Sequence, residues 1–210
     1  SQLAAVIRQP GGVSLLGPLQ PQYLIAAGES QSAGRLLTYV NASAPRHALY
    51  DAYFIHSRTQ GSAPLQGKLL QPEIATPDIV RVREDFPFPV LMLQTESDLL
   101  GLLNAYPSNQ EDNDNFCLWE IAGSAHADLY TFIDAWTDPG GNPAIAAVRE
   151  ELEPVPGIIS CQLPVNSGPQ HFVANAALVA LDRWVRDGVA PSRAPRLAVS
   201  GEPPAIVRDE

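Results

Sequence analysis

The pentapeptide Gly28-Glu29-Ser30-Gln31-Ser32 combines residue types suited to nucleophilic chemistry. It stands between a short apolar run and a segment with helical spacing, which predicts a sharp strand-to-helix turn. Such a turn holds the Ser30 hydroxyl away from the backbone, where it can attack a carbonyl once a base removes its proton. The backbone N–H of Gln31, at the helix start, is then expected to bind the oxyanion. The alternative is that Ser30 or Ser32 only caps the helix.

The base for this serine must be one of four histidines: His47, His56, His126 and His171. His126 follows a strand-like segment through a run of small residues, which would place it at the C-terminal edge of a parallel sheet, where ligands bind. His171 opens the best predicted helix and is the alternative base. His56 is expected to be a hydrogen-bonded structural histidine, and His47 to be solvated. We therefore predict that His126 is the base.

An acid is needed to orient that histidine and to stabilise its cation. Asp98 comes just after the predicted strand 89–94, and Glu96, two residues earlier, is the alternative. Asp98 could instead cap the short helix predicted over 98–104. The order Ser30, Asp98, His126 along the chain is one of the orders in which catalytic triads occur.

Short apolar runs without alternation are typical of strands buried on both faces of a sheet. Such runs occur at residues 23–27, 48–56, 89–94 and 116–121. Helical spacing follows the first run at 35–40 and is clearest over Phe172–Val189. The apolar residues expected to form the stripe of this helix are Val173, Ala176, Leu178, Val179, Leu181 and Trp184. Strands alternating with helices predict an α/β fold, with a mostly parallel sheet flanked by helices.

Composition and charge limit the possible partners. The 210 residues are 45% hydrophobic, and we place a single domain portion over 1–210, with its core at 20–190 and an extended proline-rich tail at 191–210. A net charge of −10 argues against nucleic acid and anionic membranes. No apolar run reaches the roughly 18 residues of a membrane span. A bridge between Cys117 and Cys161 would favour a secreted or periplasmic location over a cytoplasmic one, and two free thiols are the alternative.

Four segments carry a resemblance to a known family: GESQSAGRL at 28–36, YDAYFIH at 50–56, LWEIAGSAHAD at 118–128, and residues 168–188. The chain resembles the C-terminal half of an α/β-hydrolase, and more narrowly bacterial proteins described as containing an α/β-hydrolase domain. The resemblance implies Ser30 on the nucleophile elbow, His126 as base and Asp98 at the acid position. In the complete fold four strands precede the elbow, and one of their loops supplies the second oxyanion donor. We therefore expect an N-terminal half, as a separate or cleaved chain, to be a partner.

These residues together predict a serine hydrolase that cleaves a small-molecule carboxylic ester through an acyl-enzyme. We expect no metal and no cofactor, because the mechanism needs none and no metal-binding spacing such as H-E-x-x-H occurs. Amide cleavage and acyl transfer by the same residues stay open. The alternative from another class is a catalytically silent α/β-hydrolase-fold subunit used for interaction.

Overall fold

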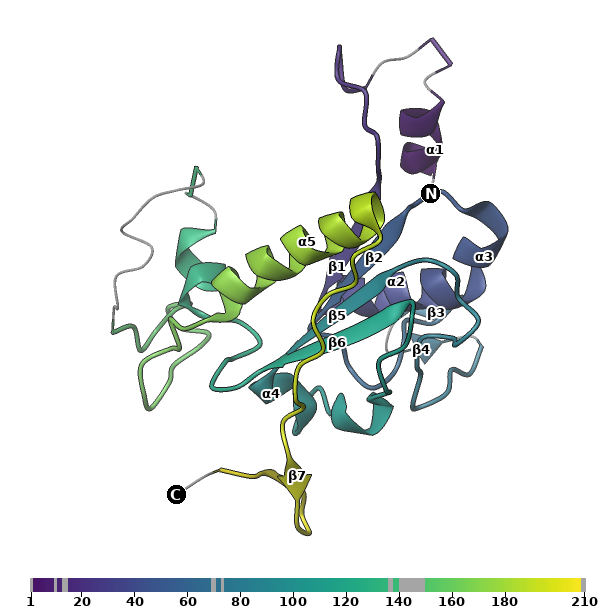
Figure 1. Cartoon of the computed structure of the whole chain (residues 1–210). Helices are drawn as coiled ribbons and strands as arrows, with labels where there is room; N and C mark the ends of the chain where they lie inside the picture. The colour runs from purple at the N-terminus through teal and green to yellow at the C-terminus, as the bar shows by residue number, and fades with distance from the viewer. Residues whose placement is uncertain are drawn as a thin grey trace.

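A four-stranded parallel sheet forms the centre of the computed structural model, which describes residues 2–9, 11–12, 15–68, 71–72, 74–135, 138–139 and 150–208. Its strands, in the spatial order β1-β2-β5-β6, are β1 (Ile25–Glu29), β2 (Ala52–His56), β5 (Val90–Thr95) and β6 (Phe116–Ile121). Every neighbouring pair in this sheet is parallel. Helices cover both faces (Figure 1). The predicted α/β class, a mostly parallel sheet flanked by helices, is confirmed.

The other elements surround this sheet. They are α1 (Gln2–Arg8), α2 (Gln31–Ala42), α3 (Ala44–His47), β3 (Gly67–Lys68), β4 (Gln71–Pro72), α4 (Glu96–Leu99), η1 (Tyr106–Ser108), the π-helical turn η2 (Tyr130–Asp134), α5 (Gln170–Asp187), β7 (Val199–Ser200) and β8 (Ala205–Ile206). The pairs β3–β4 and β7–β8 are antiparallel. The tail predicted as extended thus ends in a short hairpin. The sequence also predicts helical pieces over 127–150, and most of residues 136–149 lie outside the described part of the chain.

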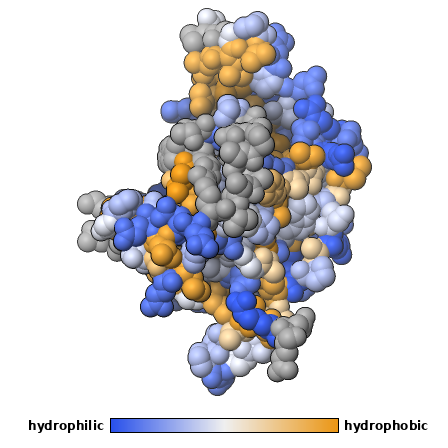
Figure 2. Space-filling model, turned by 90° about the vertical axis from the view of Figure 1, so that its left-hand side faces the viewer, coloured by the Kyte–Doolittle hydropathy of each residue, from blue (hydrophilic) through white to orange (hydrophobic). Residues whose placement is uncertain are grey.

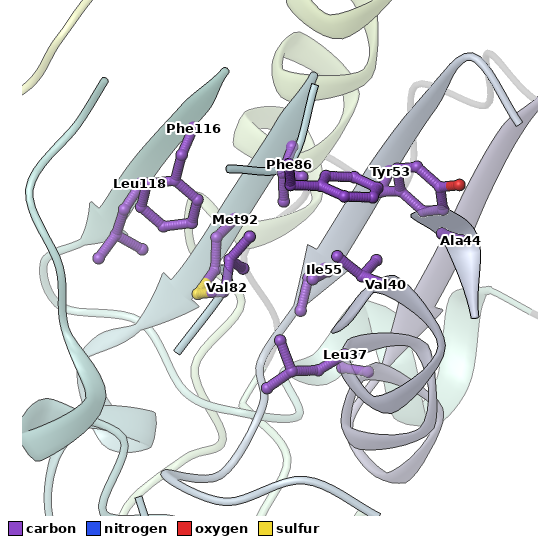
Figure 3. Packing of buried hydrophobic residues seen from close by; sticks show 12 residues of the cluster. Leu37, Val40, Ala44, Tyr53, Ile55, Val82, Phe86, Met92, Phe116 and Leu118 are labelled. Atoms are coloured by element: carbon purple, nitrogen blue, oxygen red, sulfur yellow. The ribbon is translucent and has the colours of Figure 1, made fainter. Parts of the chain in front are cut away.

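The side chains of each strand alternate between the two faces of the sheet, so each face presents apolar residues to the helix that covers it. On the α2 face, Tyr53 and Ile55 of β2 and Met92 of β5 join Leu37 and Val40 of the helix in one cluster, drawn in Figure 3. Each of these side chains is almost fully buried. This packing fixes α2, and therefore the turn that leads into it, against the sheet.

The opposite face is covered by α5. Ala177, Leu181 and Trp184 of this helix pack with Phe54 of β2 and Leu91 of β5. The observed stripe agrees with the predicted one in part: Leu181 and Trp184 are buried as expected, whereas Leu178 and Val179 are 39% and 57% exposed. From Ala177 onwards the buried positions are spaced by four and then three residues, as expected for one face of a helix.

The two edge strands of the sheet, β6 and β1, differ in how much of the chain covers them. The C-terminal tail covers β6: the indole N–H of Trp119 donates to the carbonyl of Ser192 over 2.8 Å, and the Leu197 N–H donates to Glu120 over 2.7 Å. At the other edge, β1 pairs only with β2 among the described strands. The segment before β1 exposes several large apolar side chains, and hydrophobic residues gather at that end of the molecule, the top of Figure 2: Leu3, Leu15, Leu16, Leu19 and Tyr23.

Two further findings concern the cysteines and the helices. Cys117 and Cys161 are both free thiols, so the disulfide alternative is absent from the structure. Within the described residues, no helix has the length and apolar character needed to cross a bilayer.

Candidate active site

Ser30 occupies the turn between β1 and α2 with φ 56° and ψ −119°. This conformation is rare for a residue with a Cβ, and such strain costs about 1–3 kcal/mol. The hydroxyl makes no capping hydrogen bond to the helix. Instead, Oγ lies 3.0 Å from Nε2 of His126. The capping alternative therefore does not describe Ser30, whose side chain is directed to an imidazole.

Gly28 and the end of β2 hold this turn in place. A Cβ on Gly28 would lie 2.7 Å from the carbonyl oxygen of Ser32, so only glycine allows the strand and the first turn of α2 to approach this closely. The backbone N–H of Ser30 donates to the carbonyl of His56 over 3.0 Å. The first N–H groups of α2, that of Gln31 among them, have no acceptor within the helix. They are the donors that an oxyanion at Ser30 would meet.

His126 is fixed at three points in the loop after β6. Its backbone N–H donates to Ser97 Oγ over 2.7 Å, and its carbonyl accepts from Gln170 Nε2 over 3.2 Å. Its Nδ1 lies 2.7 Å from Asp98 Oδ1. Because a carboxylate only accepts, Nδ1 carries the proton and Nε2 is left to accept from the Ser30 hydroxyl. This is the tautomer that a general base requires.

Asp98 is fully buried and uses its two oxygens for different tasks. Oδ1 contacts His126, while Oδ2 accepts the backbone N–H of Thr95 over 2.7 Å. The second contact belongs to a capping box, in which Thr95 caps α4 and Asp98 is the third residue of the helix. The helix predicted over 98–104 is therefore observed earlier and shorter, as Glu96–Leu99. Capping and contact with histidine, which the sequence presented as alternatives for Asp98, occur together.

The surroundings shift the acidities of these groups in directions that suit acid–base chemistry. Burial alone would raise the pKa of Asp98, but hydrogen bonds, first that from His126, outweigh it and hold this pKa below its ordinary value. The hydrogen bond to Asp98 raises the pKa of His126 above its ordinary value, against the opposing effect of burial. Burial raises the pKa of Glu29, whose Oε1 lies 3.9 Å from His126 Nε2.

A comparison with models of protein families matches residues 1–210 to the alpha/beta hydrolase domain. The chain belongs to this family. Comparisons with curated proteins and with solved structures give no match. Membership indicates hydrolase-type activity and confirms the family resemblance inferred from the sequence.

Glu96 and His171, the alternative acid and base, make other contacts. Glu96 accepts the backbone N–H of Gly123 over 2.7 Å and pairs with Arg208. The His171 ring lies against Tyr130, with 3.8 Å between ring centroids, and its Nε2 contacts Asn175. Neither is brought into the chain of contacts from Ser30 to Asp98.

Three residues that support the site carried no prediction from the sequence. Ser97 and Gln170 hold the backbone of His126, and Asn166 donates to the carbonyl of Gly123 over 2.6 Å. Ser97 could have been found, because it lies inside the Thr95–Asp98 capping box. Gln170 and Asn166 come from a distant segment, and no local pattern marks them. Among the described residues, no cluster of three or more His, Cys, Asp or Glu side chains could hold a metal ion.

Proposed function

We propose that this hydrolase cleaves carboxylic esters, with Ser30 as nucleophile, His126 as general base and acid, and Asp98 as the group that orients the imidazole. The observation that carries the proposal is the unbroken chain of contacts from Ser30 Oγ through His126 to Asp98, at 3.0 Å and 2.7 Å. The turn that presents Ser30 adds support, because it holds the hydroxyl in a conformation that capping does not explain.

In this mechanism His126 Nε2 takes the proton of Ser30 as Oγ attacks the ester carbonyl carbon. The tetrahedral oxyanion accepts a hydrogen bond from the Gln31 N–H, and Asp98 stabilises the imidazolium. His126 then returns the proton to the departing alcohol, which leaves Ser30 acylated. Water, deprotonated by His126, releases the acid and restores the serine. An alcohol acceptor in place of water would give acyl transfer by the same residues.

We also propose that a further polypeptide segment, such as an N-terminal half of the protein, pairs with the edge of β1. The C-terminal tail covers the edge at β6, whereas β1 has one partner among the described strands and follows a segment with exposed apolar side chains. An exposed strand edge is a template for another strand. We propose such a partner segment as the source of the second oxyanion donor.

The test of the catalytic proposal is the intact mass of the assembled protein after exposure to a fluorophosphonate. We expect one adduct on the wild type, none on Ser30→Ala, and labelling slowed by about 10²–10⁴-fold in His126→Ala, since the serine loses its base. Ser32→Ala is the matched control, because it removes the neighbouring hydroxyl, and it should be labelled like the wild type. An adduct that persists in Ser30→Ala, or its absence from the wild type, would refute the proposal.

Ester cleavage is separated from amide cleavage by a pair of chromogenic substrates with the same acyl group. We expect release of nitrophenol from the p-nitrophenyl ester, and none from the p-nitroanilide. Hydrolysis of the anilide at a comparable rate would contradict the assignment to esters while leaving the serine mechanism intact.

A further inference from the structure

A hollow of about 190 Å³ opens between the end of β1 and the start of α5. Glu29, His56, Asp128, Tyr130, Gln170 and His171 are among the residues that line it. It adjoins the proposed reacting groups, because Glu29 directly precedes Ser30 and its Oε1 is 3.9 Å from His126 Nε2. A substrate held at Ser30 could therefore extend an arm into this hollow.

Two lining side chains have hydrogen-bond acceptors without a donor. Gln170 is 4% exposed and uses Nε2 for the carbonyl of His126 and for His56 Nε2, which leaves Oε1 without a partner among the described residues. Asp128 is 1% exposed, and its Oδ1 accepts both the N–H and the hydroxyl of Thr131 over 2.9 Å. Its Oδ2 is likewise unpartnered in the described part of the chain. Buried acceptors are rarely left unpaired, so both point to a missing donor.

The charge around the hollow is negative. Glu29 and Asp128 contribute carboxyl groups to its lining. Burial lowers the pKa of His56 to about 4, so this imidazole is neutral near pH 7. No Lys or Arg is among the lining residues. The charged side chains that a ligand would meet among the lining residues are therefore acidic.

We infer that this hollow is a substrate subsite for a primary ammonium group carried by the ester, an inference that rests on the proposed esterase function. An ammonium group has a positive charge and three N–H donors, which matches a hollow with two carboxyl groups and an amide oxygen free to accept. A hydroxyl would satisfy one acceptor and leave the charge unmatched. A carboxylate or phosphate arm would be repelled.

The experiment compares ethyl ω-aminoalkanoates of increasing chain length with the ethyl alkanoates in which a methyl group replaces the ammonium. The readout is the ratio of kcat/KM within each pair, so that effects common to both substrates cancel. We expect a preference of roughly tenfold for the ammonium ester at the length that reaches the hollow, the size of one charged hydrogen bond. Glu29→Gln and Asp128→Asn should reduce this ratio, while Glu84→Gln, an exposed acid outside the hollow, should keep it.

A ratio near one at every chain length, or a ratio unchanged in both Glu29→Gln and Asp128→Asn, would overturn the assignment. An equal preference for trimethylammonium esters would also overturn it, because that group has no N–H to donate. Binding of n-butylammonium chloride, followed by calorimetry on wild type and Asp128→Asn, requires no turnover. Weaker binding to the variant supports the subsite even if fluorophosphonate labelling of Ser30 fails, and equal binding refutes it even if labelling succeeds.

Discussion

The replacement Gly28→Ala tests whether close packing of β1 against α2 positions the proposed nucleophile. The new Cβ would lie 2.7 Å from the Ser32 carbonyl oxygen, 2.8 Å from its carbon and 3.1 Å from the Ala33 nitrogen. All three are backbone atoms of the first turn of α2, so no side-chain rotation relieves the overlap. The strand and the helix must move apart until the shortest contact approaches the 3.4 Å of ordinary packing.

This movement is expected to affect both stability and reactivity. Overpacking of this kind costs about 1–3 kcal/mol, which exceeds the roughly 0.4–1 kcal/mol that a Gly-to-Ala change gains by restricting the unfolded chain. Ser30 lies within the displaced turn, and a shift approaching 1 Å at a reacting group can slow a reaction by about 10²-fold. We therefore expect a lower free energy of unfolding in urea and fluorophosphonate labelling slowed by about 10- to 100-fold.

Gly34→Ala is the matched control, since it makes the same change within α2. The nearest atom to its Cβ would be the Ala63 nitrogen at 3.6 Å, an ordinary contact. Removing a helical glycine should stabilise the protein by about 0.5–1 kcal/mol and leave labelling at the wild-type rate. If Gly28→Ala proved as stable and as reactive as Gly34→Ala, close approach at Gly28 would not be what positions Ser30.

Two further predictions concern the imidazole and the sheet edge. Because contact with Asp98 raises the pKa of His126, the labelling rate should increase with pH through a midpoint above 6.5, as the base loses its proton. In Asp98→Asn the Thr95 N–H needs the amide oxygen, which turns the amide N–H₂ towards His126 Nδ1 and puts the imidazole proton on Nε2. Labelling should then fall by up to about 10⁴-fold, and a pH profile identical to wild type would contradict this reasoning. For β1, hydrogen exchange in the isolated chain should be faster at Ile25–Glu29 than in β2, and slower once the proposed N-terminal partner is present; unchanged exchange would argue against pairing at that edge.

The sheet was largely predictable because continuous apolar runs mark strands that are buried on both faces, as β2 and β5 are almost throughout. The observed β6 has the predicted bounds, 116–121, and β5 differs from its predicted run by one residue at each end. Predicted strand 23–27 is observed two residues later, as Ile25–Glu29, because pairing with β2 decides where a strand ends. The packing face of α5 was predictable only in part: Leu181 and Trp184 pack as expected, but Leu178 and Val179 are exposed, because a helix with apolar residues on several sides buries only those that meet the sheet.

The site was predictable to the extent that local sequence encodes it. Ser30, Asp98 and His126 each follow a strand, and parallel strands bring their C-terminal ends to one edge, so their meeting could be inferred from order alone. The left-handed conformation of Ser30 could not be inferred, because it depends on how closely Gly28 lets α2 approach. The contact from Gln170 to the His126 carbonyl could not be inferred either, because it joins residues far apart in the chain.

The capping box gives a physical reason why Asp98 rather than Glu96 faces the histidine. Oδ2 of Asp98 is held by the Thr95 N–H, so the carboxylate plane is fixed and Oδ1 can point only along one direction, towards Nδ1. The start of a four-residue helix thereby sets the tautomer of an imidazole on another loop. Glu96, one residue inside the same helix, has its carboxylate on Gly123 and so steadies the loop that carries His126. Of the two acids considered from the sequence, Asp98 thus contacts the ring of His126, and Glu96 holds the backbone of Gly123 in the same loop.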